Sequence, residues 1–420
     1  CSNFIYTEGA VLVDSLLSAD ITGGDGGLCS PPAITSGTLA FSKPKPGDYN
    51  CDAPPKLATS MLDYVRSVAN ISFGIMTGDI PPHDAWFATP ENIIPQLKAA
   101  FDAMAIIKAK IYPAIGNHEA SPLKYVPQPI FDALDAVKLL KNYGSYTLNP
   151  TPGLRIVSLN TNFCYTMKFY LYGNTAEYDP RSEVQWLYQQ LQAAEDIDEH
   201  VWVIGHVPPL RSIALTIGRL FVARYSPHVI AEQFFGHSHY DEFSLTYGLD
   251  GKSAQNAVST SWIGPSVTPY TDLNPAFRVY KVDTKSWNVF ESLTYVADLN
   301  KSASWDATDS SPNWHLEYLA RQTYSTYAPI AADQPLSAGW WHNVTNVLES
   351  NPAAFKQYCM RSEICSSVIV PLKKRNDDYS HDASAAGSDM SPNLAASVIT
   401  GIRSLSELRP NAKPWNKKLC

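Results

Sequence analysis

Four short apolar runs in this chain each end in a glycine that is followed by Asp, Asn or His. These endings are Gly78-Asp79, Gly116-Asn117-His118, Gly205-His206 and Gly236-His237-Ser238-His239. In an α/β sheet, ligands bind outside the carboxyl ends of the strands, so we expect these side chains to converge although they are far apart in the sequence. Asp and Asn oxygens together with imidazole nitrogens suit zinc, manganese or iron rather than calcium. The pattern therefore predicts a metal site at the edge of a sheet.

Short apolar runs alternate with helical patterns over the first 300 residues. Residues 57–68 carry apolar side chains at helical spacing, and an apolar run follows at residues 71–76. Further strands are predicted at residues 111–115, 154–159 and 201–204. Residues 277–282 and 289–295 are typical of an antiparallel hairpin. Strands that alternate with helices predict an α/β fold, and the hairpin makes its sheet mixed.

The ends of the chain differ in character from its middle. Residues 1–56 are rich in Gly, Pro, Ser and Asp and are expected to be irregular. Residues 57–300 form the predicted α/β domain. Residues 301–420 are expected to form a smaller helical region, with helices around residues 314–324, 340–358 and 394–408.

Composition excludes several classes of protein. With 420 residues, 45% of them hydrophobic and 17% charged, the chain can bury a large core, and intrinsic disorder is excluded for most of its length. A net charge of −8 provides no global positive field for a nucleic-acid polymer or an anionic membrane, so an anionic substrate must be bound locally, by metal. No apolar run approaches the roughly 20 residues that span a bilayer, which excludes a transmembrane segment.

The cysteines and sequons favour a secreted protein or one of the lysosomal or vacuolar lumen. Cys29 with Cys51 and Cys359 with Cys365 suit disulfide bonds that close short loops, the alternative being unpaired buried thiols. Glycosylation sequons begin at Asn70, Asn300 and Asn343. Seven cysteines leave at least one thiol unpaired, and the candidates are Cys1, Cys164 and Cys420.

The four endings, taken in order with their flanking residues, resemble the calcineurin-like metallophosphoesterase superfamily. Within it, the chain is similar to acid sphingomyelinase and its secreted relatives, mainly at residues 78–86, 116–119, 205–209 and 234–243 and also at residues 159–164, 223–225, 273–275 and 277–280. The similarity is close over residues 1–300 and loose beyond them. It implies a mixed β-sheet sandwich flanked by helices, with residues 57–300 as the catalytic domain.

The resemblance also implies roles for single residues. It gives a site for two zinc ions, with the ligands Asp79, Asn117, His206, His237 and His239. Asp79 would bridge both ions, and His239 would serve the second. His118 matches the residue that protonates the leaving oxygen, and His83 stands where the family has a further active-site histidine. A cationic imidazole beside a bound phosphate can supply the proton that an alkoxide leaving group requires.

The implied reaction is hydrolysis of sphingomyelin, at a membrane surface, to ceramide and phosphocholine by a metal-activated hydroxide. An alternative hypothesis keeps this chemistry but takes soluble nucleotides or other phosphodiesters, because the saposin-like domain of acid sphingomyelinase is absent from the sequence. The oligomeric state stays open.

One part of the family pattern is missing. The family opens with Asp-X-His at the end of its first strand, and counting back from residues 6–9 places the His at Cys1 and the Asp before the chain. The first strand and both ligands are therefore expected to be absent, which leaves one zinc site incomplete. Two accounts compete: a fragment of an active enzyme, or an impaired chain or binding protein that lacks one metal site. Because residues 207–235 contain no cysteine to match the family's partner of Cys164, that thiol is expected to be free.

Overall fold

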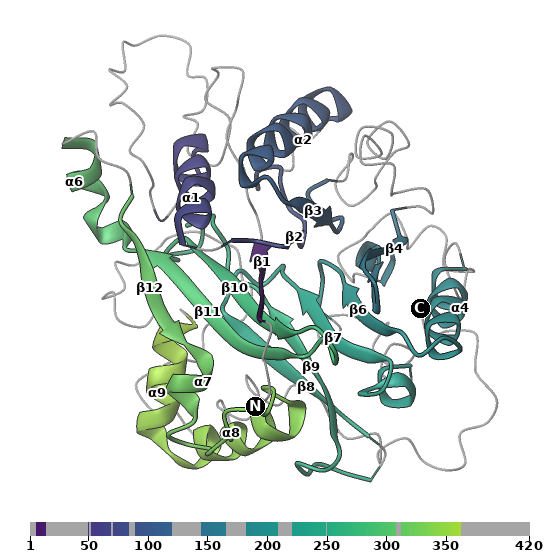
Figure 1. The fold of residues 1–420 in the computed structure, drawn as a ribbon. Helices are drawn as coiled ribbons and strands as arrows, with labels where there is room; N and C mark the ends of the chain where they lie inside the picture. The colour runs from purple at the N-terminus through teal and green to yellow at the C-terminus, as the bar shows by residue number, and fades with distance from the viewer. Residues whose placement is uncertain are drawn as a thin grey trace.

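Two six-stranded β-sheets form the centre of the molecule (Figure 1). The computed structural model describes residues 6–13, 49, 52–68, 70–83, 89–119, 144–164, 182–208, 221–248, 250–307 and 312–362. The strands of the first sheet are, in spatial order, β12 (Trp314–Leu319), β11 (Val289–Ala297), β10 (Ala276–Asp283), β1 (Tyr6–Val13), β2 (Phe73–Met76) and β3 (Lys110–Pro113). Those of the second are β4 (Tyr146–Thr151), β5 (Leu154–Ser158), β6 (His200–Ile204), β7 (Ile230–Phe235), β9 (Ala257–Ile263) and β8 (Glu242–Tyr247).

Both sheets are mixed. In the first, β1, β2 and β3 run parallel with Val13 opposite Met76 and Met76 opposite Pro113, whereas β10, β11 and β12 pair antiparallel. In the second, β5, β6, β7 and β9 run parallel, and β4 and β8 are antiparallel edge strands. Parallel neighbours in register end at the same edge, which brings the loops after them together.

Large aromatic side chains fill the space between the sheets. Trp202 on β6 lies 5.5 Å, between ring centroids, from Phe73 on β2, and its indole N–H donates to the carbonyl of Trp287 at 2.8 Å. Phe234 on β7 meets Tyr280 on β10 at 5.2 Å. Buried indole N–H groups need an acceptor, so this bond allows a tryptophan to occupy the core. These contacts confirm the predicted α/β class, with a mixed sandwich flanked by helices.

Helices cover the outer faces of the sandwich (Figure 1). α1 (Pro55–Val68) buries Leu57, Met61 and Val65, which recur at helical spacing on one face. It joins α2 (Pro90–Met104) and the turn η2 (Ala105–Ile107) on the first sheet. α4 (Glu183–Glu195) packs Leu187 and Leu191 against the second sheet.

The C-terminal elements pack on the sandwich as well. η8 (Leu299–Lys301) and α6 (Ser302–Ala307) precede β12, and α7 (Ala320–Tyr324), α8 (Ala338–Ser350) and α9 (Pro352–Arg361) follow it. Trp341 of α8 contacts Phe243 of β8 and Trp262 of β9, at 4.2 and 5.6 Å between ring centroids. The helical region therefore packs on the second sheet through contacts between aromatic rings.

Two predictions about single elements are wrong. Tyr6–Val13 forms the strand β1, between β10 and β2, although residues 1–56 were expected to be irregular. β1 forms because it pairs with β10 on one side and with β2 on the other, and this tertiary pairing outweighs the weak strand preference of its own sequence. Trp314–Leu319 forms the edge strand β12 instead of the start of a helix. Its apolar residues alternate, which fits a strand as well as a helix. The helix predicted at residues 394–408 lies outside the described residues.

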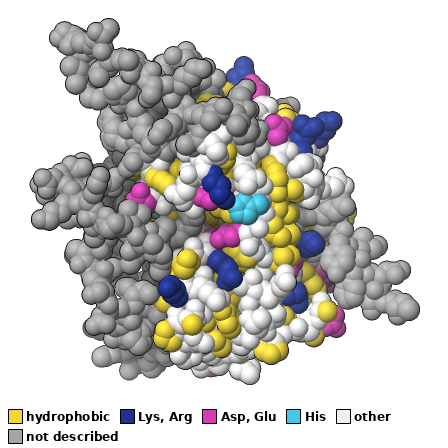
Figure 2. Space-filling view, turned by 90° about the vertical axis from the view of Figure 1, so that its left-hand side faces the viewer, with side chains coloured by type: hydrophobic (Ala, Val, Ile, Leu, Met, Phe, Trp, Pro, Cys, Tyr) yellow, Lys and Arg dark blue, Asp and Glu magenta, His cyan; other side chains and the backbone are white. Residues whose placement is uncertain are grey.

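The surface shown in Figure 2 bears mixed charge. On this face, acidic and basic side chains of the described residues are interspersed among hydrophobic ones, with no extended patch of one sign. In the parts of the chain that the structure describes, no helix has the length and apolar character needed to cross a bilayer.

Candidate metal centre

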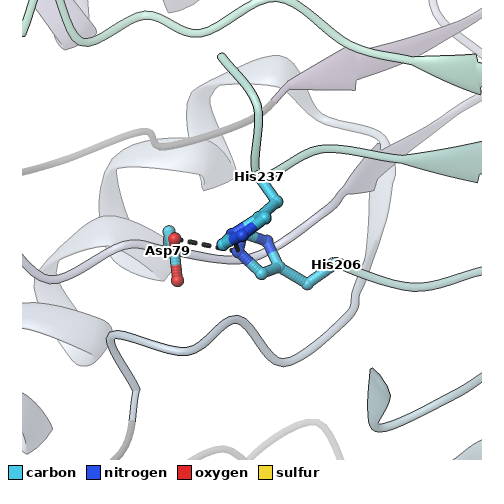
Figure 3. Close-up of side chains that lie close together, drawn as sticks. All are labelled: Asp79, His206 and His237. Atoms are coloured by element: carbon cyan, nitrogen blue, oxygen red, sulfur yellow. Dashed lines mark hydrogen bonds and ion pairs between the residues drawn. The ribbon is translucent and has the colours of Figure 1, made fainter. Parts of the chain in front are cut away.

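Asp79, His206 and His237 meet at the carboxyl ends of three strands (Figure 3). Nε2 of His206, after β6, lies 2.9 Å from Oδ2 of Asp79, after β2. The same nitrogen lies 3.1 Å from Nδ1 of His237, after β7. Asn117, after β3, adds its Oδ1 at 3.1 Å from Nε2 of His206. The structure thus brings together four of the five predicted metal ligands.

The hydrogen bonds of His206 indicate what this cluster can bind. Its Nδ1 donates to the carbonyl of Thr77 at 2.7 Å, so the ring proton is on Nδ1 and Nε2 carries a lone pair. That lone pair faces the oxygens of Asp79 and Asn117, which accept but do not donate at these atoms. Acceptors that face one another repel unless a cation lies between them. The donor set therefore fits a divalent metal ion, held by oxygen and imidazole ligands.

Electrostatics keep the Asp79 carboxylate ionised. Burial would raise its pKa, but the neighbouring imidazoles of His206 and His118 lower that pKa well below the ordinary value of an aspartate. A hydrogen bond from the backbone N–H of His118 to Oδ1, at 2.8 Å, also stabilises the anion. Asp79 is 3% exposed, so its charge acts inside a nearly dry site.

The metal ligands are held by backbone in the left-handed region. Asp79 has φ of 58°, His237 of 73° and His239 of 67°, and Gly78 before Asp79 has φ of 104°. Non-glycine residues adopt this region at a cost of about 1–3 kcal/mol each and cluster at functional sites. A side chain at Gly78 would collide with the backbone of Gly116, so glycine is required where the two loops touch.

Glu119 ties these two loops together. Its Oε2 accepts the backbone N–H of Gly116 at 2.7 Å and that of Asp79 at 3.1 Å, and its Oε1 accepts that of Ile80 at 2.7 Å. The side chain is buried. Glu119 belongs to the Gly-Asn-His-Glu run, yet the sequence analysis gave it no role. Its place directly after Asn117 and His118 was the available signal.

The second sheet supplies further supports for the ligand loops. Thr161 of the turn η4 (Thr161–Cys164) accepts the backbone N–H groups of His206 and Val207 at 3.2 and 2.8 Å. Asn162 donates to the carbonyl of Gly116 at 3.0 Å. These bonds connect the loops of β3, β5 and β6. Residues 159–164 carry part of the family resemblance, and a supporting role explains their place there.

The loop with His237 and His239 is anchored by Asp241. This buried carboxylate pairs with Arg278 on β10 and accepts hydrogen bonds from the hydroxyls of Thr294 at 2.7 Å and Tyr318 at 2.9 Å. His239 is also buried, and burial lowers its pKa to about 3, so its imidazole is neutral. A neutral imidazole is the form that binds metal. That His239 serves a second ion stays a prediction.

His118 and His83 lie beside the ligands. Nε2 of His118 is 3.9 Å from Oδ2 of Asp79, and its Nδ1 lies 3.0 Å from the carbonyl of Pro82. Burial lowers the pKa of His118 to about 4, an effect that the charge of Asp79 partly offsets. The His83 ring lies 4.6 Å from that of His118 and 5.1 Å from that of His239, between centroids. The structure thus gathers all seven predicted site residues, whereas their separate roles stay predictions.

The other predicted modification sites are partly described. The sequon asparagines Asn70, Asn300 and Asn343 are all exposed. Cys359 is disulfide-bonded, and its predicted partner Cys365 lies outside the described residues. Cys29 and Cys51 lie outside them too. Their pairing and the free thiol at Cys164 stay predictions.

Comparisons with known proteins agree with this site. Residues 56–241 match the family described as "Calcineurin-like phosphoesterase". The chain is 33% identical over 361 residues to the sphingomyelin phosphodiesterase of Homo sapiens, covering 78% of this chain and 53% of that protein. It is 36% identical over 327 residues to that of Bos taurus, covering 70% and 50%. It is 30% identical over 346 residues to the cyclic GMP-AMP phosphodiesterase SMPDL3A of Bos taurus, covering 72% of each.

The fold and the site therefore define a calcineurin-like phosphoesterase, and the chain belongs to that family. Within the family, its relatives include sphingomyelin phosphodiesterases and a cyclic GMP-AMP phosphodiesterase. The chain spans about half the length of the two sphingomyelin phosphodiesterases. Family membership implies divalent metal ions, and the ligand cluster around His206 fits them.

Proposed function

We propose that this chain is the catalytic part of a zinc-dependent phosphodiesterase that hydrolyses sphingomyelin to ceramide and phosphocholine. The main observation that supports a metal-dependent hydrolase is the convergence of lone pairs around Nε2 of His206. The identity of 33% over 361 residues to a sphingomyelin phosphodiesterase supports the substrate. Zinc suits a site with imidazole, carboxylate and amide ligands.

The protein residues divide the work in this proposal. Asp79, Asn117, His206 and His237 would hold an ion, and His239 would serve a second one. Divalent ions supply positive charge for phosphate oxygens and a water nucleophile at neutral pH. His118 and His83 lie beside the ligands, where an imidazole can give a proton to the leaving alcohol of ceramide.

The proposed compartment is extracellular or lysosomal. Exposed sequon asparagines and a disulfide bond at Cys359 support it, because disulfide bonds persist in oxidising compartments. In such a protein, Asn70, Asn300 and Asn343 would carry glycans. The phosphodiester lipid would be taken from a membrane surface.

A second candidate substrate is a soluble nucleotide. One relative, whose alignment covers 72% of this chain and 72% of its own length, is named a cyclic GMP-AMP phosphodiesterase. Both candidates use the same metal site, so they differ only in what binds beside it. A third candidate is a protein that binds a phosphodiester without cleaving it.

Hydrolysis assays on the zinc-loaded protein separate these candidates. Sphingomyelin in detergent micelles and cyclic GMP-AMP are offered in parallel to the wild-type chain and to His206→Ala. We expect turnover of sphingomyelin that the variant lacks. Faster turnover of the nucleotide would favour the second candidate. Zinc binding with no turnover of either substrate would reject both hydrolases and leave the binding protein.

A further inference from the structure

Asp52 places a buried carboxylate behind one of the active-site histidines. The residue lies just before α1, 31 positions ahead of His83. Its Oδ1 is 2.5 Å from Nδ1 of His83, and its Oδ2 accepts the backbone N–H of the same residue at 2.9 Å. The Asp52 side chain is 1% exposed, and that of His83 is 16% exposed. One carboxylate thus fixes both the backbone and the ring of His83.

The carboxylate is itself held in place and ionised. The hydroxyl of Thr268, in the loop between β9 and β10, donates to Oδ1 of Asp52 at 3.2 Å. Burial would raise the pKa of Asp52, but the hydrogen bond from His83 and the charge of that ring lower it below its ordinary value. An ionised carboxylate can only accept, so the proton between Oδ1 and Nδ1 belongs to the imidazole.

A proton on Nδ1 determines what the other ring nitrogen can do. Because Nδ1 is bonded to Asp52, any proton that the ring exchanges with a substrate is exchanged at Nε2. The rings of His118, His239 and Tyr270 lie within 4.6 to 5.1 Å of the His83 ring, between centroids, and pack around it. Packing alone allows the ring to flip by half a turn, because the two orientations have nearly the same shape. The Asp52 bond distinguishes them.

We propose that Asp52 is a positioning residue for the reaction: it holds the His83 ring in one orientation by accepting its Nδ1 proton, and it stabilises the protonated imidazole whose Nε2–H is directed at the leaving oxygen. This inference rests on the proposed phosphodiesterase function and adds to it the residue that orients His83 as the proton donor. Carboxylates that orient a catalytic imidazole in this way act through the histidine and never touch the substrate.

Two substrates with the same phosphocholine group test the proposal. Sphingomyelin releases an alkoxide that needs a proton, whereas p-nitrophenylphosphocholine releases p-nitrophenolate, which leaves without one. We expect Asp52→Ala to lower kcat for sphingomyelin by about 100-fold, the lower end of what a proton donor contributes, and to change kcat for the p-nitrophenyl ester by less than about 3-fold. His83→Ala should show the same selectivity, and the double variant should be no slower than either single one.

A matched control separates positioning from folding. Thr268→Val removes the hydroxyl that bonds to Asp52 and that accepts the backbone N–H of Ala53, but it keeps both bonds between Asp52 and His83, so the ratio of the two kcat values should stay at the wild-type value. Zinc content per chain is measured for every variant. Equal losses on both substrates in Asp52→Ala, at unchanged zinc content, would overturn the proposal while leaving the phosphodiesterase function in place.

A spectroscopic measurement does not depend on activity. In protein labelled with 15N-histidine, an Nδ1 proton that is shared with a carboxylate gives a far-downfield resonance. We expect this resonance to disappear in both Asp52→Ala and His83→Ala and to persist in Thr268→Val. If wild-type protein cleaves neither substrate, the proposed function fails and this resonance still decides the orientation of His83. A resonance that survives Asp52→Ala would refute the role of Asp52.

Discussion

Replacing Glu119 by glutamine tests whether one buried carboxylate holds the metal-ligand loops. The carboxylate accepts three backbone N–H groups, two at Oε2 and one at Oε1. A glutamine has a single side-chain oxygen, so even with that oxygen in the place of Oε2 its amide N–H₂ faces the N–H of Ile80. That leaves a buried backbone donor and a buried amide donor without acceptors. At about 1–3 kcal/mol for each, Glu119→Gln should destabilise the protein by about 2–6 kcal/mol.

Urea unfolding in the presence of a chelator measures this loss without metal. Burial, followed by the charge of Asp79, raises the pKa of Glu119 to about 7, so the comparison is made at pH 8, where the wild-type carboxylate is ionised. Glu317→Gln, at an exposed position of β12, is the matched control and should cost less than about 0.5 kcal/mol. Zinc affinity should also fall in Glu119→Gln, because the bond from Ile80, the residue after Asp79, is lost and the loop that holds the Asp79 backbone at positive φ is weakened. A loss of stability below about 1 kcal/mol, with zinc affinity unchanged, would refute this reasoning.

Three further predictions concern pH, metal and the contact between loops. Burial raises the pKa of Glu232 to about 8, above its value in the unfolded chain, so the stability of the wild-type protein should fall as pH rises towards 8. The stability of Glu232→Gln should fall less over the same range. Urea midpoints that change equally with pH in the two proteins between pH 5 and 8 would contradict this. Chelation should lower the Tm of the wild-type protein, because removal of the ion leaves Nε2 of His206 facing only acceptors. The Tm of His206→Ala, which lacks this ligand, should not change with chelator. A wild-type Tm that is insensitive to chelator would argue against the metal site. Gly116→Ala should abolish zinc binding, since its Cβ would overlap the Asp79 side chain, whereas Gly248→Ala, whose Cβ meets nothing closer than 3.8 Å, should retain zinc on elemental analysis.

The strands that carry the site were predictable because each is a short apolar run that ends in glycine. Residues 71–76 and 201–204 contain β2 and most of β6, and the polar residues after them converge as expected. β1 was missed, since its apolar residues occupy only part of a strand whose partners, β2 and β10, come from distant segments. β12 was assigned to a helix because its apolar residues also fit helical spacing and the helix α7 follows it directly.

The supporting residues were harder to predict than the ligands. A metal ligand reveals itself by its type and by the glycine before it. Asp52 lies in a stretch with no secondary-structure pattern, and only the fold brings it to His83. Thr161 and Asn162 act through backbone atoms of other loops, a role that hydroxyls and amides fill throughout proteins. Their residue types therefore carry no signal for the site.

The backbone of the site explains why so many supports are needed. Asp79, His237 and His239 all adopt positive φ, where glycine would be free of strain but could offer no ligand atom. At about 1–3 kcal/mol each, the three residues together cost about 3–9 kcal/mol, a substantial part of the stability of a typical domain. The bonds from Glu119 and Asp241 offset some of this cost in the folded protein. A bound cation would offset more, because it replaces the repulsion between facing lone pairs by attraction. Metal binding and the stability of these loops should therefore be linked, so that each ligand removed costs stability as well as affinity.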